Sequence, residues 1–150
     1  YFSRVGADER DEFGSTPRLR VFEFEGTRDP CPWLTVPTAI DFQTSLGWEK
    51  IHARRAELTA YVRERLTAEL GLPLATPAHP ALHGAMTAFW LPKGVEAAWL
   101  RGHLWERYRI EVPIIERPEG LLVRVSTWWF NTEEEVDLLT QALKDLLPSG

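Results

Sequence analysis

The sequence predicts an α+β domain of two layers, in which helices cover one face of a small sheet. Three segments in the second half of the chain have the pattern of strands, at 83–91, 110–115 and 121–126. Helical repeats of apolar residues occupy 95–108 and the stretch from 132 to 147. The resulting order is β-α-β-β-α, and its natural packing is an antiparallel or mixed sheet with helices on one side.

The composition supports a folded domain and excludes several classes of protein. A chain of 150 residues has the size of one domain, and its 44% hydrophobic residues can form a packed core. The net charge of −5 argues against binding to nucleic acid or to anionic membranes. One cysteine cannot form an internal disulfide, and no apolar run approaches the ~20 residues of a transmembrane helix. With no signal peptide at its start, we expect a cytoplasmic protein.

The first half of the chain predicts one strand and two helices. Residues 18–25 alternate polar and apolar side chains, which favours a strand, and the loop at 26–32 is rich in turn residues. A helix is expected over 35–46, because Pro37 stands in its first turn, where a missing N–H costs little. A longer helix is expected over 48–70 from its apolar repeat.

Turns and caps divide the second half. Residues 76–80 form a proline-containing linker, and turns are expected at 92–94 and 116–120. The run Thr132-Glu133-Glu134-Glu135 is a capping box. In this arrangement the Thr132 hydroxyl accepts from the Glu135 N–H while the Glu135 side chain reaches back.

The loop Gly26-Thr27-Arg28-Asp29 is the first candidate for chemistry. Gly26 permits close approach of the backbone, Thr27 offers a hydroxyl and an N–H, and Arg28 offers a planar cation. This combination suits an oxyanion such as phosphate. A purely structural turn is the alternative.

The second candidate is Arg124, in the otherwise apolar strand 121–126. Leu122, Arg124 and Ser126 share one face of this strand because side chains alternate. An arginine buried there without a partner would be costly, and a carboxylate bound by both ends of the guanidinium is the best geometric match. A salt bridge to an acidic residue of the same chain is the alternative.

A set of motifs in one order resembles a known family. The motifs are Gly26-Thr27-Arg28-Asp29, Val36 to Phe42, Leu46-Gly47-Trp48, Leu91-Pro92, Val123-Arg124-Val125-Ser126 and Phe130-Asn131-Thr132. Together they resemble the C-terminal part of class V aminotransferases, in the isopenicillin N epimerase-like branch. These are pyridoxal-phosphate enzymes of fold type I, so the resemblance implies the small C-terminal domain of that fold.

The resemblance also implies roles for particular residues. Thr27, with Gly26 beside it, would contact the cofactor phosphate across the interface of a homodimer. Arg124 would bind the α-carboxylate of an amino-acid substrate, which agrees with the chemical argument above. Asn131 and Thr132 match a family motif in which Phe130 replaces a tyrosine, and there we expect a helix start.

The departures from the family are equally informative. The family forms a Schiff base between the cofactor and a lysine of its large domain. None of Lys50, Lys93 and Lys144 has the family's lysine context, so we expect no catalytic residue in this chain. We therefore expect a C-terminal fragment that does not hold the cofactor alone, and Tyr1 reads as a cut end.

This interpretation assigns three regions to the chain. Residues 1–30 would be the edge of the large domain with its phosphate-contacting loop, 31–75 the linking helices, and 76–150 the small domain. The competing interpretation is a free-standing α+β binding or dimerisation module without cofactor.

The sequence argues against only one of the reaction types found in this family. Cysteine desulfurases of this class carry a nucleophilic cysteine shortly before the strand arginine, but 116–122 contains none, and Cys31 lies elsewhere between two prolines. Epimerisation, transamination and C–S lysis all stay open. His79 and His83 lack a third ligand nearby, so no metal site is expected.

Overall fold

The computed structural model describes residues 9–10, 14–16, 19 and 26–148. Contacts between residues divide the chain into two compact units, residues 1–42 and 43–150. The strand expected over 18–25 lies almost wholly outside the described residues.

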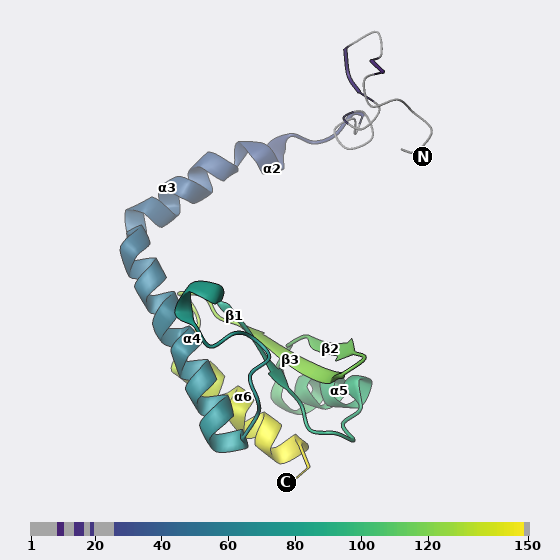
Figure 1. The fold of residues 1–150 in the computed structure, drawn as a ribbon. Coiled ribbons are helices and arrows are strands. Elements are labelled where there is room, and N and C mark those ends of the chain that lie inside the picture. Colours follow the sequence, from purple (N-terminus) through teal and green to yellow (C-terminus); the bar gives the residue numbers. More distant parts are fainter. Residues whose placement is uncertain (1–8, 11–13, 17–18, 20–25, 149–150) are drawn as a thin grey trace. The chain divides into compact units, whose positions relative to one another are not determined.

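The described part of the first unit contains α2 (Cys31–Leu34) and the start of α3 (Val36–Leu46), labelled in Figure 1. The helix predicted over 35–46 is confirmed. The loop predicted to run to residue 32 was wrong at its end, because α2 begins at Cys31. The reason is local: the Asp29 carboxylate accepts from the Cys31 N–H at 2.9 Å, and a proline suits the first turn of a helix.

The second unit contains a three-stranded antiparallel sheet in the order β1-β3-β2, visible in Figure 1. Its strands are β1 (Met86–Trp90), β2 (Ile114–Arg117) and β3 (Gly120–Ser126). In the register, Phe89 and Ile114 lie opposite Val123 on either side of β3.

Three helices of this unit pack against one face of the sheet (Figure 1): α4 (Trp48–Leu70), α5 (Ala97–Tyr108) and α6 (Glu133–Leu146). A short 3-10 helix, η2 (Pro80–Leu82), precedes β1. The core combines the inner face of the sheet with the apolar stripes of the helices. Its fully buried members include Phe89, Val123, Leu66, Leu100, Leu104 and Leu143. The predicted α+β class, the β-α-β-β-α order and the one-sided helical layer are confirmed.

Helix ends agree closely with the sequence. α4 occupies the predicted 48–70, and it ends where Gly71 adopts a left-handed φ of 63°, a conformation that glycine tolerates best. The capping box of α6 is also confirmed, since both of its hydrogen bonds are present.

Two strands differ from the prediction. β1 is shorter than the predicted 83–91, because its partner strand β3 ends at Ser126. The last backbone hydrogen bond between the two segments runs from the Thr127 N–H to the Ala85 carbonyl. β2 begins at Ile114 rather than at residue 110. Pro113 has no N–H to donate to a ladder, and only its carbonyl is used, by the Arg124 N–H at 3.0 Å.

No helix among the described residues has both the length and the apolar content needed to span a bilayer.

Candidate functional site

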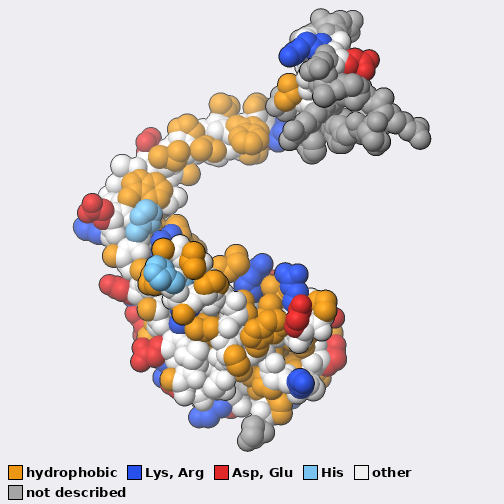
Figure 2. Space-filling view, in the orientation of Figure 1, with side chains coloured by type: hydrophobic (Ala, Val, Ile, Leu, Met, Phe, Trp, Pro, Cys, Tyr) orange, Lys and Arg blue, Asp and Glu red, His pale blue; other side chains and the backbone are white. Residues whose placement is uncertain are grey.

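The sheet has one face that the helices cover and one face that they do not. Thr87 and Phe89 of β1 point into the covered face, and the alternate residues Ala88 and Trp90 point the other way. On β3, Arg124 belongs to the uncovered face. Figure 2 shows hydrophobic side chains gathered over the sheet, with Lys and Arg side chains near them. This uncovered face is the candidate site.

Arg124 lies in the middle of the uncovered face. Its register partner on β1 is Ala88, whose side chain is small. The arginine is half-buried, and its Nε is buried without a hydrogen-bond partner among the described residues. Within the same described part of the chain, the Arg124 guanidinium makes no ion pair. The alternative of an internal salt bridge therefore finds no acidic partner there.

The predicted phosphate loop belongs to the first unit. Gly26 has a φ of 66°, which favours glycine, and nothing lies within 4 Å of the position that a Cβ would take. Thr27 is exposed, and the Arg28 guanidinium lies 5.5 Å from the centre of the Trp33 ring. The two sequence-predicted sites thus fall in different units.

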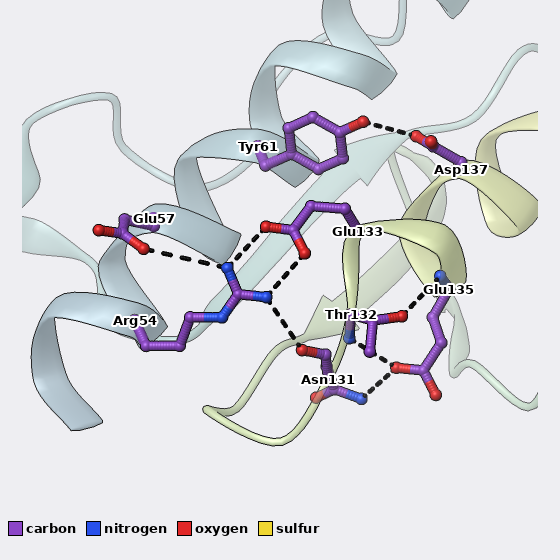
Figure 3. Close-up of polar contacts among 8 residues, drawn as sticks. All are labelled: Arg54, Glu57, Tyr61, Asn131, Thr132, Glu133, Glu135 and Asp137. Atoms are coloured by element: carbon purple, nitrogen blue, oxygen red, sulfur yellow. Dashed lines mark hydrogen bonds and ion pairs between the residues drawn. The ribbon is translucent and has the colours of Figure 1, made fainter. Parts of the chain in front are cut away.

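A polar cluster that the sequence did not reveal joins α4 to the start of α6 (Figure 3). Arg54 donates from Nη1 and Nη2 to the two carboxylate oxygens of Glu133, at 2.6 and 2.7 Å. Its Nη2 also reaches the Asn131 carbonyl at 3.4 Å. The bond from Arg54 is the main reason that the pKa of Glu133 is lowered to about 2. The partners are 79 residues apart, so no local pattern could have indicated the pair.

The Asn-Thr motif takes part in the same cluster as a helix start. Thr132 N–H donates to Glu135 Oε2 at 3.0 Å, and Glu135 N–H donates to Thr132 Oγ1 at 3.3 Å. Asn131 donates from Nδ2 to Glu135, and its Oδ1 accepts from the Trp128 N–H at 2.8 Å. These bonds, led by that from Asn131, lower the pKa of Glu135. Asn131 and Thr132 therefore fix the helix start, as predicted.

A buried hydroxyl pair attaches the residues after β3 to α4. Thr59 Oγ1 and Thr127 Oγ1 lie 3.1 Å apart, and both residues are buried. The Arg55 guanidinium lies 5.9 Å from the centre of the Trp128 ring just beyond. Together with the Arg54–Glu133 pair, these contacts hold the segment 127–131 at the end of the strand that carries Arg124.

The lysines and the cysteine of the described residues do not gather at one place. Lys50 on α4, Lys93 after β1 and Lys144 on α6 are all exposed, and each stands on a separate element. Cys31 is a free, exposed thiol on α2. Across the part of the chain that the structure describes, no three His, Cys, Asp or Glu residues gather in a way that would hold a metal ion.

Comparison with known proteins shows which proteins the chain resembles. No protein-family model matches the chain. An isopenicillin N epimerase from Amycolatopsis lactamdurans is 59% identical over 93% of this chain, and one from Streptomyces clavuligerus is 53% identical over 91%. Over most of its own length, the chain is therefore similar to isopenicillin N epimerases. It spans about a third of the length of these two relatives, 35% and 34%.

Further similarities are weaker. A probable chloroplastic L-cysteine desulfhydrase from Arabidopsis thaliana is 30% identical over 83% of the chain and 29% of its own length. The solved cysteine desulfurase of Thermococcus onnurineus matches 95% of this chain and 38% of its own, with a TM-score of 0.68 at 20% identity. An alanine–glyoxylate aminotransferase from a Nostoc species matches 62% of this chain and 25% of its own, with a TM-score of 0.52 and 26% identity.

These matches confirm the resemblance that the motifs indicated. The fold of the second unit is that of the small domain of fold type I pyridoxal-phosphate enzymes. The desulfurase likeness, at 20% identity, shows the fold alone.

Proposed function

We propose that this chain is the part of a pyridoxal-phosphate-dependent amino-acid enzyme that binds the substrate carboxylate, through Arg124. One observation carries the proposal. The Arg124 guanidinium makes no ion pair with the described residues and stands on the sheet face that the helices leave uncovered. Epimerisation is the reaction favoured, because the chain is 59% identical to an isopenicillin N epimerase over 93% of its length.

The chemistry of Arg124 follows from its surroundings. A guanidinium offers two parallel N–H donors to a carboxylate, so it fixes both the position and the plane of that group. Ala88 stands directly across the ladder, and its side chain is a single methyl group. A carboxylate held there fixes the orientation of the substrate α-carbon, whose proton an epimerase removes from one side and returns on the other.

The first unit offers residues that fit the edge of a cofactor site. Bound pyridoxal phosphate supplies an electron sink for negative charge at the substrate α-carbon. Gly26 has the backbone conformation that favours glycine and open space around it, and Thr27 presents an exposed hydroxyl. We propose that these two residues donate to the cofactor phosphate within a homodimer. The exposed lysines do not fit the role of cofactor anchor, so that lysine is assigned to sequence outside this chain.

The first test concerns the gene. The reading frame upstream of the Tyr1 codon should encode a lysine-bearing domain, and the enzyme expressed from the complete frame should carry the visible absorbance of bound pyridoxal phosphate. A complete gene that encodes only these 150 residues would contradict the proposal. It would support the free-standing module instead.

The second test concerns Arg124 in that enzyme. Arg124→Gln should raise KM for the amino-acid substrate on the order of a hundredfold, because a desolvated charge pair is lost. Arg124→Lys should be intermediate, since an ammonium cannot form the two parallel bonds. Arg117→Gln, an exposed arginine at the end of β2, is the matched control and should leave KM unchanged. An unchanged KM for Arg124→Gln would refute the role.

The phosphate contact has its own test. Thr27→Val keeps the shape of the side chain but removes the hydroxyl, so the enzyme should bind pyridoxal phosphate more weakly by about tenfold. Thr27→Ser should keep the affinity. Titration of the cofactor-free enzyme, followed by its absorbance, measures this directly. Equal affinity for Thr27→Val and the parent would remove Thr27 from the site.

A further inference from the structure

Ser126 lies two residues after Arg124 on β3, so the two side chains share the uncovered face. Ser126 is exposed, and its register partner on β1 is Met86. Its hydroxyl makes no hydrogen bond to any residue that the structure describes. The fold therefore leaves a second hydrogen-bond donor unused on the strand face that carries Arg124.

The edge of β3 is open next to Ser126. The Arg124 N–H points toward β2, where it donates to the Pro113 carbonyl, and the Ser126 N–H points the same way because N–H directions alternate. Pairing with β2 has ended there, and among the described residues the Ser126 N–H has no partner. A hollow of about 300 Å³ opens at this point, and it is lined by residues 108–112, by 125–127, by Asn131 and by part of α6. The edge of β3 beside Ser126 is therefore free of a paired β2 residue among the described residues.

The charges around the hollow favour an anion on the uncovered face of the sheet over an anion inside the hollow. Glu111 and Glu135 both line the hollow, and Arg109 is the cation among its lining residues. Glu135 is already bonded to Asn131 and Thr132. A carboxylate inside the hollow would meet two acids, whereas one above β3 meets the Arg124 guanidinium and the Ser126 hydroxyl.

We propose that Ser126 donates its hydroxyl hydrogen to the same substrate carboxylate that Arg124 binds. The inference rests on the proposed function of Arg124. A carboxylate has about four acceptor positions, and a guanidinium that binds both oxygens uses two of them, so a hydroxyl donor can bind beside it. Ser126 is then a second substrate-binding residue, and the strand ending Arg124-Val125-Ser126 forms the carboxylate site as a unit.

The test uses the enzyme expressed from the complete reading frame that contains this chain. Ser126→Ala should raise KM for the amino-acid substrate about tenfold, because one hydrogen bond to a charged group is lost, while kcat stays within about twofold. Ser126→Thr keeps a hydroxyl and should restore most of the affinity. Thermal unfolding of each variant should match the parent, since the hydroxyl makes no bond within the described fold.

The outcomes separate this inference from the proposed function. If Arg124→Gln raises KM and Ser126→Ala does not, the role of Ser126 is refuted and that of Arg124 stands. If Ser126→Thr behaves like Ser126→Ala, the effect comes from shape and not from the hydroxyl, which also refutes the inference. If Arg124→Gln leaves KM unchanged, both proposals fail together.

Discussion

Two half-buried arginines of the second unit have opposite surroundings. Arg54, between α4 and α6, uses both Nη atoms on Glu133 and adds a bond to the Asn131 carbonyl (Figure 3). Arg124, on the uncovered face of the sheet, has no ion pair with the described residues, and its Nε is buried without a partner. Both side chains are guanidinium cations, yet the described fold provides a carboxylate partner for only one of them, Arg54.

The difference separates a residue that is paired within the fold from one for which we propose an outside ligand. Loss of Arg54 would leave a carboxylate without the partner that lowers its pKa. Loss of Arg124 would leave no group unpaired among the described residues. A half-buried cation with no internal partner gains no stabilisation from charge pairing within the fold, which is why we propose an outside anion for Arg124. The predictions below test this separation.

The largest expected loss of stability comes from a substitution in the hydrophobic core of the second unit. Phe89 is fully buried on the covered face, opposite Val123, and Phe89→Ala should lower the free energy of unfolding by about 3–5 kcal/mol. Phe130→Ala is the matched control, because Phe130 is 66% exposed. It should change stability by no more than about 0.5 kcal/mol. Urea denaturation of the 150-residue chain measures both, and equal losses would contradict the assigned core.

A smaller loss is expected when the Arg54–Glu133 pair is broken. Arg54→Met leaves Glu133 unpaired and should lower the denaturation midpoint, though less than Phe89→Ala does. The double variant Arg54→Met with Glu133→Gln should be less destabilised than the sum of the two single variants, because the partners interact. Strict additivity in this double-mutant cycle would show that the pair is not coupled.

The same pair predicts a dependence of stability on pH. The pKa of Glu133 is lowered from its ordinary 4.5 to about 2 in the folded protein, chiefly by the bond from Arg54. A lowered pKa means that the stabilisation is complete above pH 4.5 and is lost as the pH falls from there toward 2. Glu133→Gln should flatten the fall in denaturation midpoint between pH 6 and pH 2.5, compared with the parent. An unchanged pH profile would contradict the assigned pKa.

Local signals in the sequence predicted the helices well. The 23 residues of α4 were predictable because a glycine stands at each end of one continuous apolar repeat. α6 was predictable from its capping box, which combines a hydroxyl and a carboxylate three residues apart. These features act within one or two turns, so a sequence displays them directly.

Features that depend on distant residues were not predictable. The Arg54–Glu133 pair joins residues 79 apart in the sequence. The start of β2 depends on which of its residues pair with β3. Arg124 was an intermediate case. The period of two placed it on one face of its strand, but only the packing of the helices shows that this face is the uncovered one. Sequence could therefore identify the residue but not its surroundings.

A modest effect is expected at the start of α6, next to Glu133. Thr132→Ala removes the hydroxyl that accepts from the Glu135 N–H and should cost about 1 kcal/mol of stability. Thr132→Ser keeps the hydroxyl and should cost much less. If both variants unfold at the same urea concentration as the parent, the capping box contributes nothing, and the Arg54–Glu133 pair alone would hold this helix start.

The smallest effect should be at Arg124, and it is the sharpest test of the comparison. Arg124→Met keeps a long, flexible side chain but removes the charge and the buried, unpartnered Nε. Because no described residue loses a partner, the stability of the chain should stay within about 0.5 kcal/mol of the parent. The same substitution at Arg54 should lower the denaturation midpoint measurably. If Arg124→Met destabilises the chain as much as Arg54→Met, then Arg124 is a structural residue, and an outside anion is no longer needed to explain it.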